Sequence, residues 1–329
     1  MPDLTFVIVV IAIALIFDFV NGFHDSANSI ATVVATNVLS PRNAVLMAAF
    51  WNFIGAFVFS VAVATTIGKG IIDTKVVSAY IILSALIGAI TWNLITWYYG
   101  LPSSSSHALI GGLIGAGIVS SGFHSVILPG LGKVIIFIFV ARMVGFAGAV
   151  IFTIIMMWLF RKRKPAKVNN YFRKLQLVSS SFYSLGHGTN DAQKTMGIIS
   201  LLLFTSGYIS SFYVPKWVIL ISHTSIALGT YFGGWRIIKT MGLKITKITP
   251  FHGFAAETSG GLVLLITAMF GIPVSTTHVI SGSIMGVGSV KRYSGVRWQI
   301  ARNIMRAWIF TIPISAVIAG LSYLVIRLF

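Results

Sequence analysis

Carboxylates are the scarcest reactive groups in this sequence, and most of them interrupt apolar segments. The six acids are Asp3, Asp18, Asp25, Asp73, Asp191 and Glu257. All except Asp3 and Asp73 lie in or at the margin of long apolar runs, where an unpaired charge costs about 3 kcal/mol. Such an acid needs an ion pair, water or a bound cation, so each of the four is a functional candidate. For Asp18, a structural role is equally expected.

The stretch around Asp25 reads GFHDSANS and gathers polar ligands on one helical face. In a helix, Asp25 lies three residues and His24 four residues before Asn28, so the three side chains share a broad face. A carboxylate beside an amide carbonyl is an oxygen-rich set that suits a hard cation or a proton. We therefore assign Asp25, Asn28 and His24 to the binding of a coupling cation.

The stretch GHGTNDAQK repeats this arrangement in the second half of the chain and adds a lysine. Asn190 and Asp191 stand where a histidine and an aspartate stand in the first half, and Lys194 follows three residues after Asp191. We assign Asp191 to the cation site, and Asn190 and Lys194 to an anion bound beside it.

Two runs of hydroxyl side chains each follow a proline and precede a glycine-rich apolar stretch. A helix that begins there directs free backbone N–H groups and the positive end of its dipole to one point. Two such tips facing each other would form a donor-rich pocket for a tetrahedral oxyanion. The alternative is N-capping and hydrogen bonding between packed helices. The candidate ligands are Ser104, Ser105, Ser106, Ser275, Thr276 and Thr277.

Glu257, in FAAETSGG, is the one glutamate of the chain, and the equivalent position of the first half holds Leu86. We assign Glu257 to the coupling-cation site, as a ligand or a proton carrier. The alternative is an acid at the membrane margin that pairs with Lys244 or Lys247. The two histidines that directly follow the hydroxyl runs, His107 and His278, are expected either to orient the tips or to be structural.

The order of these motifs indicates an internal duplication. LPSSSSHALIGGLIGAG (101–117) aligns with IPVSTTHVISGSIMGVG (272–288) at a constant separation of 171 residues, and a proline, a histidine and three glycines coincide. The acid motifs align more weakly, at a separation of 166 residues. We predict a first repeat over residues 1–160, a basic cytoplasmic linker over 161–174 and a second repeat over 175–329. Ligand sites of duplicated membrane proteins often lie at the repeat interface, on discontinuous helices.

Both pairs of motifs are predicted to interrupt helices. Asn21-Gly22 and Gly186–Gly188 precede the two acids, so each acid is also a candidate cap of a helix that restarts there. Pro102 and Pro273 precede apolar stretches of about 14 residues, which are too short to span a bilayer. Those two stretches therefore predict re-entrant hairpins.

The elements that must position these residues are membrane helices. The chain has 329 residues, of which 56% are hydrophobic and 9% are charged. Apolar runs at 4–20, 44–66, 76–99, 134–160, 217–237 and 308–328 reach or approach the ~20 residues that cross a bilayer. The alternating pattern of a membrane barrel is absent. We predict an all-α polytopic membrane protein with about 10–12 transmembrane segments, re-entrant hairpins included.

The net charge of +18 points to a membrane surface rather than to nucleic acid. Cations cluster between apolar runs, at 161–174, 236–247 and 291–306, and short basic loops mark the cytoplasmic side near anionic headgroups. The chain has no cysteine, which excludes disulfides and thiolate metal sites.

Four motifs in order resemble the inorganic phosphate transporter (PiT) family, and the resemblance covers nearly the whole chain. They are NGFHDSANSIATVVATNVLSP, GLPSSSSHALIGG, GHGTNDAQKTMGI and GIPVSTTHVISG. The resemblance implies two inverted-topology repeats, usually in a dimer, that move phosphate with sodium or protons. The short connection between the halves is similar to that of short bacterial members.

The resemblance also implies roles for individual residues. The paired signature falls on Asp25 with Asn28 and on Asn190 with Asp191, which makes Asp25, Asn28 and Asp191 a candidate sodium site. The two hydroxyl runs match phosphate-contacting hairpins, and Glu257 matches a transport-linked glutamate. In one departure, His24 stands where the commonest signature has asparagine, as in bacterial members thought to carry metal-phosphate complexes with protons. This departure counts against sodium as the coupling ion.

The sequence thus predicts a secondary active transporter of inorganic phosphate, coupled to sodium or proton symport, with alternating access at a midplane site. Phosphate is expected to travel either free or as a metal complex. The alternatives are transport of sulfate or another tetrahedral oxyanion, a passive anion channel, and an intramembrane hydrolase. The buried acids oppose a channel, and the absence of a GxSxG elbow opposes a hydrolase.

Further expectations follow for partners and location. We expect no enzyme activity and no cofactor beyond the coupling ion and any divalent metal that travels with phosphate. A homodimer surrounded by membrane lipids, with no nucleic-acid partner, is expected as a multi-pass protein of the inner (plasma) membrane.

Overall fold

The computed structural model describes residues 2–58, 61–290 and 292–328, and every regular element within these ranges is a helix. The predicted all-α class is confirmed. The β-structure within the described ranges is limited to two isolated bridges. The α-helices are α1 (Leu4–Ala35), α2 (Pro41–Ile54), α3 (Ala62–Gly70), α4 (Ala79–Tyr98), α5 (Ser105–Ser121), α6 (Leu128–Phe160), α7 (Pro165–Thr205), α8 (Lys216–Phe232), α9 (Trp235–Lys239), α10 (Pro250–Met269), α11 (Thr276–Ser289) and α12 (Trp298–Ile326). Short helical turns are η1 (Gly55–Phe57), η2 (Phe123–Ser125), η3 (Thr240–Lys244) and η4 (Tyr293–Gly295).

Four helices, α1, α4, α6 and α12, are each long and apolar enough to cross a membrane, with mean hydropathies from 1.7 to 2.6. The outer faces of α6 and α12 carry large apolar side chains, and Ile136, Phe139 and Val317 are each more than half exposed. Apolar side chains that cover an outer surface in this way are suited to lipid. The chain is a multi-pass membrane protein.

The duplication is visible in the order of the elements. In each half, a long helix with the acid motif (α1 or α7) is followed by a helical hairpin (α4–α5 or α10–α11), a short turn (η2 or η4) and a peripheral helix (α6 or α12). The two β-bridges, Ile72 with Val126 and Thr246 with Val296, occur at equivalent points. Within the stretch 161–174 that we predict as a linker, α7 begins at Pro165, so the turn between the peripheral helix α6 and α7 is Arg161–Lys164.

The helices α1 and α7 run antiparallel. Before the start of α1, the Pro2 carbonyl accepts a hydrogen bond from the hydroxyl of Tyr208, which lies beyond the end of α7 (3.3 Å). Beyond the other end of α1, the Thr36 hydroxyl donates to Gln176 Oε1, early in α7 (2.8 Å). Antiparallel packing of equivalent helices is the relation that inverted repeats produce around an axis in the membrane plane.

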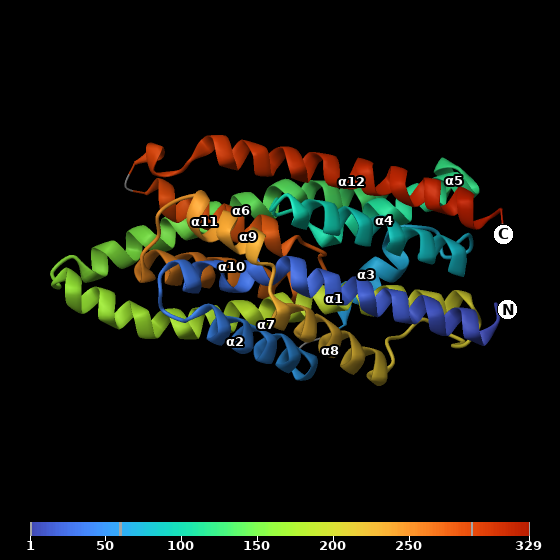
Figure 1. Ribbon diagram of the computed structural model, residues 1–329, viewed down its shortest axis with the longest axis horizontal. Coiled ribbons are helices and arrows are strands. Elements are labelled where there is room, and N and C mark those ends of the chain that lie inside the picture. The colour runs from blue at the N-terminus through green and yellow to red at the C-terminus, as the bar shows by residue number, and fades with distance from the viewer. Residues whose placement is uncertain (1, 59–60, 291, 329) are drawn as a thin grey trace.

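The two hairpins lie toward opposite ends of the molecule, and their turns meet in the interior. In Figure 1, α4 and α5 occupy the right-hand part and α10 and α11 the left-hand part. The rings of His107 and His278, in the first turns of α5 and α11, are 4.8 Å apart. Ser104 and Ser275, directly before these helices, are buried. The structure thus contains the two predicted helical hairpins, with their turns facing each other in the interior.

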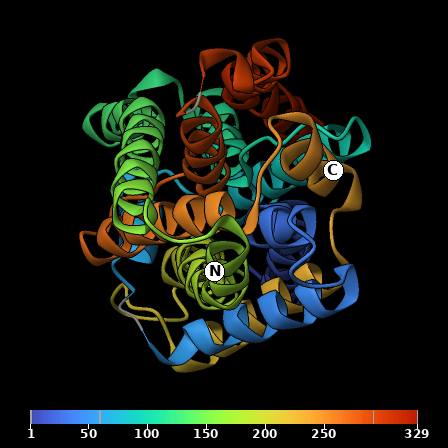
Figure 2. The same cartoon turned by 90° about the vertical axis from the view of Figure 1, so that its left-hand side faces the viewer.

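The second helix of each hairpin packs against the peripheral helix of the other half, α5 against α12 and α11 against α6. A Cβ added to Gly115 would lie 2.0 Å from the Ala316 carbonyl oxygen, and one added to Gly286 would lie 2.5 Å from that of Phe146. The small-residue stretches are therefore surfaces of close helix packing. Figure 2 shows α1 and α7 in the interior of the bundle and α6 and α12 at its periphery.

The prediction that helices break before the two acids is wrong, because α1 and α7 are continuous through both motifs. The glycines permit close helix contacts instead. A Cβ on Gly22 would lie 2.2 Å from the Ile226 carbonyl oxygen, and one on Gly188 would lie 2.5 Å from Asn52 Cα. The acids that follow stand in mid-helix, which also excludes the alternative that they only cap helices.

The two ends of the bundle differ in charge. Both chain termini lie at one end, and the turn Arg161–Lys164 and the start of α12 lie at the other (Figure 1). The turn adds four cations to the latter end, and Arg297 and Arg302 stand at the start of α12. Lys291, part of the predicted basic cluster 291–306, lies outside the described residues.

Candidate functional site

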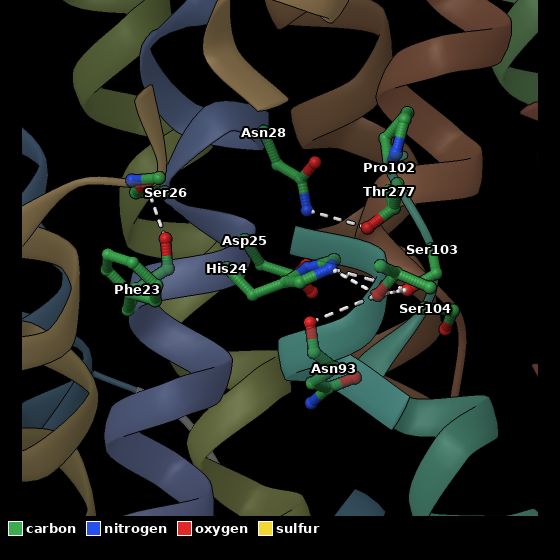
Figure 3. A network of polar contacts seen from close by, with 12 residues as sticks. Phe23, His24, Asp25, Ser26, Asn28, Asn93, Pro102, Ser103, Ser104 and Thr277 are labelled. Carbon is green, nitrogen blue, oxygen red and sulfur yellow. Dashed lines mark hydrogen bonds and ion pairs between the residues drawn. The ribbon is translucent and has the colours of Figure 1, made fainter. Parts of the chain in front are cut away.

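Asp25 belongs to the buried middle of α1 and contacts its neighbour along the chain. His24 Nδ1 lies 2.7 Å from Asp25 Oδ1. The other ring nitrogen, Nε2, lies 3.0 Å from the Thr96 hydroxyl of α4 and 3.3 Å from the Ser103 hydroxyl in the hairpin turn. Figure 3 shows His24 between the acid and this turn. His24 thus connects Asp25 to the first hairpin.

Asp191 occupies the equivalent place in α7 and has two basic neighbours on its own helix. Lys194 Nζ forms a buried ion pair with Asp191 Oδ1. His187 Nε2 lies 3.4 Å from Asp191 Oδ2. Spacings of three and four residues place all three side chains on one face of the helix. Asp191 therefore has a positive charge beside it, supplied by its own helix.

The antiparallel crossing of α1 and α7 brings the two acids together. One potential ligand atom from each of Asp25, His187 and Asp191 lies within 4.8 Å of the others, and all three side chains are buried. Two carboxylates with one lysine leave one negative charge uncompensated when the histidines are neutral. Such a site can hold a hard cation or a proton.

The second hairpin contacts this acid pair directly. Asn28 Nδ2 donates to the hydroxyls of Thr276 (3.2 Å) and Thr277 (2.9 Å), and the latter contact is visible in Figure 3. The Thr276 hydroxyl lies 3.2 Å from Asp191 Oδ2, to which it donates. Tyr183 of α7 donates to the Thr276 carbonyl at 3.0 Å. The start of α11 is therefore held by side chains from both α1 and α7.

The hydroxyl runs contain two N-caps, two threonines that are bonded to other side chains, and a buried serine hydroxyl without a partner among the described residues. Ser104 Oγ accepts a hydrogen bond from His107 N (3.3 Å), and Ser275 Oγ accepts one from His278 N (3.2 Å), so both serines are N-caps. Ser105 is buried, and its hydroxyl has no hydrogen-bond partner in the part of the chain that the structure describes. Ser106, Thr276 and Thr277 are buried in the first turns of their helices.

The arrangement can hold an anion and a cation side by side. The N-termini of α5 and α11 converge near the acid pair, and helix N-termini with hydroxyl groups favour an oxyanion. The acid pair favours a cation. Lys194 is cationic and contacts Asp191, so it favours the anion and lowers the negative charge of the acid pair. Opposite charges that bind next to each other stabilise one another most where water is excluded.

Asn190 is predicted as an anion ligand, but its amide group takes part in helix packing. Asn190 Nδ2 donates to the carbonyls of Gly186 (2.9 Å) and Leu264 (3.0 Å). The remaining atom, Oδ1, is buried without a hydrogen-bond partner among the described residues. The structure thus uses both amide hydrogens of Asn190 to join α7 to α10.

Glu257 lies apart from the acid pair, in a polar cluster of its own. Its carboxylate accepts hydrogen bonds from Thr32 (2.5 Å), Gln176 (3.0 Å) and Ser179 (2.5 Å). Thr32 follows Asp25 by seven residues on α1, which corresponds to about 10 Å along the helix. The carboxylate is therefore satisfied by three donors on α1 and α7, and the alternative pairing with Lys244 or Lys247 is absent from the described contacts.

Several residues of the site are absent from the sequence-based assignment. His187 stands in the motif GHGTND, four residues before Asp191, and this helical spacing could have revealed it. Thr96 and Ser103, the partners of His24, lie in the hairpin 72 and 79 residues further along the chain. No sequence pattern links these two residues to the acid motif.

Comparisons with known proteins identify the family. The family described as "Phosphate transporter family" matches residues 21–168 and 160–319. The chain is 55% identical, over 95% of its length and 94% of the relative's, to a "Probable low-affinity inorganic phosphate transporter" of Rhizobium meliloti. It is 44% identical, over 98% and 97% of the two lengths, to a protein of the same name from Bacillus subtilis.

A solved structure named "The sodium-dependent phosphate transporter" has the same fold, with a TM-score of 0.89 and 26% sequence identity. The match covers 99% of this chain and 100% of that chain. These relatives are named as transporters rather than as enzymes, which excludes the hydrolase alternative. With two matched regions that together reach from residue 21 to residue 319, the chain belongs to the phosphate transporter family.

Proposed function

We propose that this protein is a secondary active transporter that carries inorganic phosphate across the inner (plasma) membrane in symport with a cation. One observation carries the proposal: the tips of two hairpins, one from each half, meet beside the acid pair Asp25 and Asp191. Helix N-termini and hydroxyls suit the oxyanion, and carboxylates suit the cation. Family membership supports phosphate as the oxyanion.

In this proposal, phosphate binding is coupled to cation binding because the cation compensates negative charge in the site. Asp25 and Asp191 both repel a phosphate dianion, and Lys194 offsets only one of them. A cation bound at the acid pair removes the remaining repulsion, so cation and phosphate each raise the affinity for the other. Ser105, Ser106 and Thr277 present hydroxyls rather than the arginine forks that hold phosphate tightly, which allows release.

The coupling cation is sodium or a proton. Sodium is supported by the carboxylate oxygens of Asp25 and Asp191 and by the solved relative, which is named as sodium-dependent. Proton coupling is supported by His24, because its imidazole lies 2.7 Å from a buried carboxylate and histidine is a common proton carrier in transporters. The histidine at this position also keeps transport of a metal-phosphate complex within the proposal.

Alternating access between two inverted halves fits the arrangement of the helices. α1 and α7 cross antiparallel at the acid pair, and the hairpins α4–α5 and α10–α11 approach it from opposite ends (Figure 1). Opening of one hairpin at a time would expose the same site to one side and then to the other.

The orientation and partners follow from surface charge and from exposed apolar faces. The end with the turn Arg161–Lys164 faces the cytoplasm by the positive-inside rule, so both termini face outward. The exposed apolar residues of α6 and α12 provide a surface for lipid and for a second copy in a homodimer. The proposed transport cycle uses no cofactor other than the ions.

The test is uptake of radiolabelled phosphate into proteoliposomes that contain the purified protein. Gradients of sodium and of protons are imposed separately, with and without magnesium, and excess sulfate is added as a competitor. We expect accumulation above equilibrium with one cation gradient. Downhill flux that is independent of any gradient would indicate a channel, and sulfate that competes equally with phosphate would indicate a general oxyanion carrier.

A further inference from the structure

Two adjoining cavities lie outside the phosphate site, at the end of the molecule that holds the turn Arg161–Lys164 (Figure 1). The first, the basic cavity, has a volume of about 400 Å³ and lies between the loop before α10, the end of α11 and the turn η4. The second, the apolar cavity, has a volume of about 540 Å³ and lies between the end of α6, the start of α7 and the start of α10. Thr249 and His252 line both, so the cavities meet at the start of α10.

The basic cavity concentrates positive charge. Three cations, Lys247, Arg292 and Arg297, belong to its lining, and no acid does among the described residues. The salt bridges of the described ranges all involve Asp25 or Asp191, so none of the three cations is paired with a carboxylate there. Like charges that converge on one cavity repel one another, and a bound anion relieves that repulsion.

The backbone around the basic cavity is closely packed. A Cβ added to Gly288, in the last turn of α11, would lie 2.8 Å from Thr246 Oγ1, and one added to Gly295 would lie 2.4 Å from the Gly288 carbonyl oxygen. The Thr246 hydroxyl donates to the Gly295 carbonyl at 2.8 Å, and a β-bridge joins Thr246 to Val296. The loop before α10 and the turn η4 are thus fixed relative to each other, and with them the attachment points of the three cations.

The duplication shows that the fold does not require these cations. The equivalent positions of the first half can be counted from the matching β-bridge and from the matching turn η2. They hold Asp73, Gly122 and Ile127 in place of the three cations. The positive-inside rule accounts for cations on one side of the membrane, but it does not account for their convergence on one cavity.

The apolar cavity offers a different surface, at the level where the membrane ends. Side chains from three helices line it: Met157, Phe160, Val168 and Phe251. Arg161 and Arg163 belong to the lining as well. The Arg161 guanidinium lies 4.9 Å from the centroid of the Trp158 ring, and Trp158 is 61% exposed. An exposed tryptophan beside an arginine at the end of an apolar helix is typical of the membrane–water interface.

The two cavities together select the chemistry of the ligand. An inorganic anion would occupy the basic cavity and leave the apolar one unused, and a neutral lipid would do the reverse. An anionic phospholipid has both parts, a charged phosphate ester and acyl chains. Basic pockets between helices on the cytoplasmic side are also a known type of site for anionic headgroups.

We propose that the two cavities form a binding site for one anionic phospholipid of the cytoplasmic leaflet. The phosphate of the headgroup binds among Lys247, Arg292 and Arg297, and an acyl chain lies along Val168 and Phe251. The lining of the basic cavity includes the end of α11, so the bound lipid links the second hairpin to the surrounding membrane. The inference goes beyond the proposed function, because neither cavity belongs to the phosphate site.

The test counts lipids that stay bound to the purified protein in detergent, by native mass spectrometry. The probe is phosphatidylglycerol, and phosphatidylcholine with the same acyl chains is the neutral comparison. The wild type is expected to retain one phosphatidylglycerol per chain, with an affinity about tenfold higher than for phosphatidylcholine. The triple variant Lys247→Gln, Arg292→Gln and Arg297→Gln should lose this preference. Equal retention of the two lipids by the wild type would overturn the site.

The matched control removes three cations from the same end of the molecule, at positions that line neither cavity. It is the triple variant Lys162→Gln, Lys164→Gln and Lys167→Gln. This variant should keep the preference of the wild type. An equal loss in both triple variants would show general attraction between a basic surface and anionic lipid, and would overturn the site.

A separate variant keeps the test decisive if the loss of three cations disturbs folding. Val168→Trp fills the apolar cavity and changes no charge, so phosphatidylglycerol should bind about tenfold more weakly. Unchanged binding in this variant would remove the acyl chain from the apolar cavity and overturn the proposal.

A competition experiment distinguishes a lipid from a soluble phosphate ester. Glycerol 3-phosphate in excess carries the same charged group without acyl chains, and it should leave the lipid bound. Displacement of the lipid would assign the basic cavity to a soluble phosphate compound and overturn the lipid as its occupant. None of these measurements uses phosphate uptake, so a failure of the proposed transport function would leave their outcome unaffected.

Discussion

The two halves of the site each contribute one acid, but they compensate its charge in different ways. Asp191 is paired with Lys194, whose ammonium group contacts the carboxylate directly. Asp25 is hydrogen-bonded to His24, whose imidazole exists in a neutral and in a protonated form. The second half therefore has a built-in counter-charge, and the first half has a variable one. We infer that the first half responds to the coupling ion.

The two hairpins also differ in how they contact the acids. The first hairpin reaches Asp25 through His24, which contacts Thr96 and Ser103. The second hairpin reaches Asp191 directly, through the hydroxyl of Thr276. A change at His24 therefore affects the acid and the first hairpin together, whereas the second hairpin senses the acid itself.

Breaking the charge pair of the second half should have the largest effect. Lys194→Met leaves Asp191 buried without its cation, and removal of one partner of a buried ion pair costs about 3–5 kcal/mol. We expect this loss in the free energy of unfolding, measured by denaturation in detergent. The double variant Asp191→Asn with Lys194→Met removes both charges and should recover most of the loss. Equal stability of the single and double variants would contradict the charge pair.

Neutralising the acid of the first half should abolish transport and spare the fold. Asp25→Asn keeps the side chain's size and removes the charge that holds the cation, so phosphate uptake should fall about 100-fold. Uptake into proteoliposomes and the unfolding curve are measured on the same preparation. Asp191→Asn should lose uptake as well, but with a loss of stability that Asp25→Asn does not show. Wild-type uptake in both would disprove the cation site.

Replacing His24, the variable counter-charge of the first half, should change which cation gradient drives phosphate uptake better. His24→Asn introduces the residue type that the second half already has in Asn190, and it removes a group that can bind a proton. We expect uptake driven by a proton gradient to fall about tenfold relative to uptake driven by sodium. An unchanged ratio of the two rates would show that His24 only positions the hairpin.

The hairpin tips should affect phosphate affinity moderately. Ser105→Ala removes a buried hydroxyl that is free to bind a ligand, so the KM for phosphate should rise about fivefold, equivalent to ~1 kcal/mol. Ser104→Ala is the matched control next to it. It removes an N-cap and should lower stability by about 1 kcal/mol with a smaller change in KM. Thr276→Ala tests the other tip, and an unchanged KM in both tip variants would exclude the tips from the phosphate site.

Asn190 should have the smallest effect on transport. Its amide group binds two backbone carbonyls, so Asn190→Ala is expected to lower stability by about 1 kcal/mol and to leave the KM for phosphate within about twofold of the wild type. Thermal unfolding and uptake kinetics distinguish the two effects. A large rise in KM without a loss of stability would restore Asn190 as a phosphate ligand.

Much of the fold could be predicted because its signals are local. The lengths of the apolar runs indicate membrane helices, and the alignment of Pro102 with Pro273 indicates a pair of hairpins. The acids were candidates for the same reason, since a charge in an apolar run needs compensation wherever its partner lies. The pairing of Asp25 with Asp191 followed from the duplication rather than from any contact visible in the sequence.

The continuity of α1 and α7 through the acid motifs could not be predicted, because a glycine can serve two opposite purposes. Gly22 and Gly188 can end a helix or allow another helix to approach, and the sequence is compatible with both. The structure shows the second use, with the Ile226 carbonyl and Asn52 in the places that a Cβ would fill. Likewise, the amide of Asn190 looked like part of a ligand set, and only the packing of α7 on α10 showed that it binds backbone carbonyls.

The sequence by itself determined that the chain is a duplicated membrane protein with few, expensive acids, because hydropathy and charge are properties of each residue and add up along a segment. The tertiary structure decided which acids share a site. Asp25 and Asp191 meet because α1 and α7 cross antiparallel, while Glu257 receives three donors and Asp18 receives none in the described ranges. These outcomes depend on how closely helices from distant parts of the sequence approach one another, and no single segment contains that information.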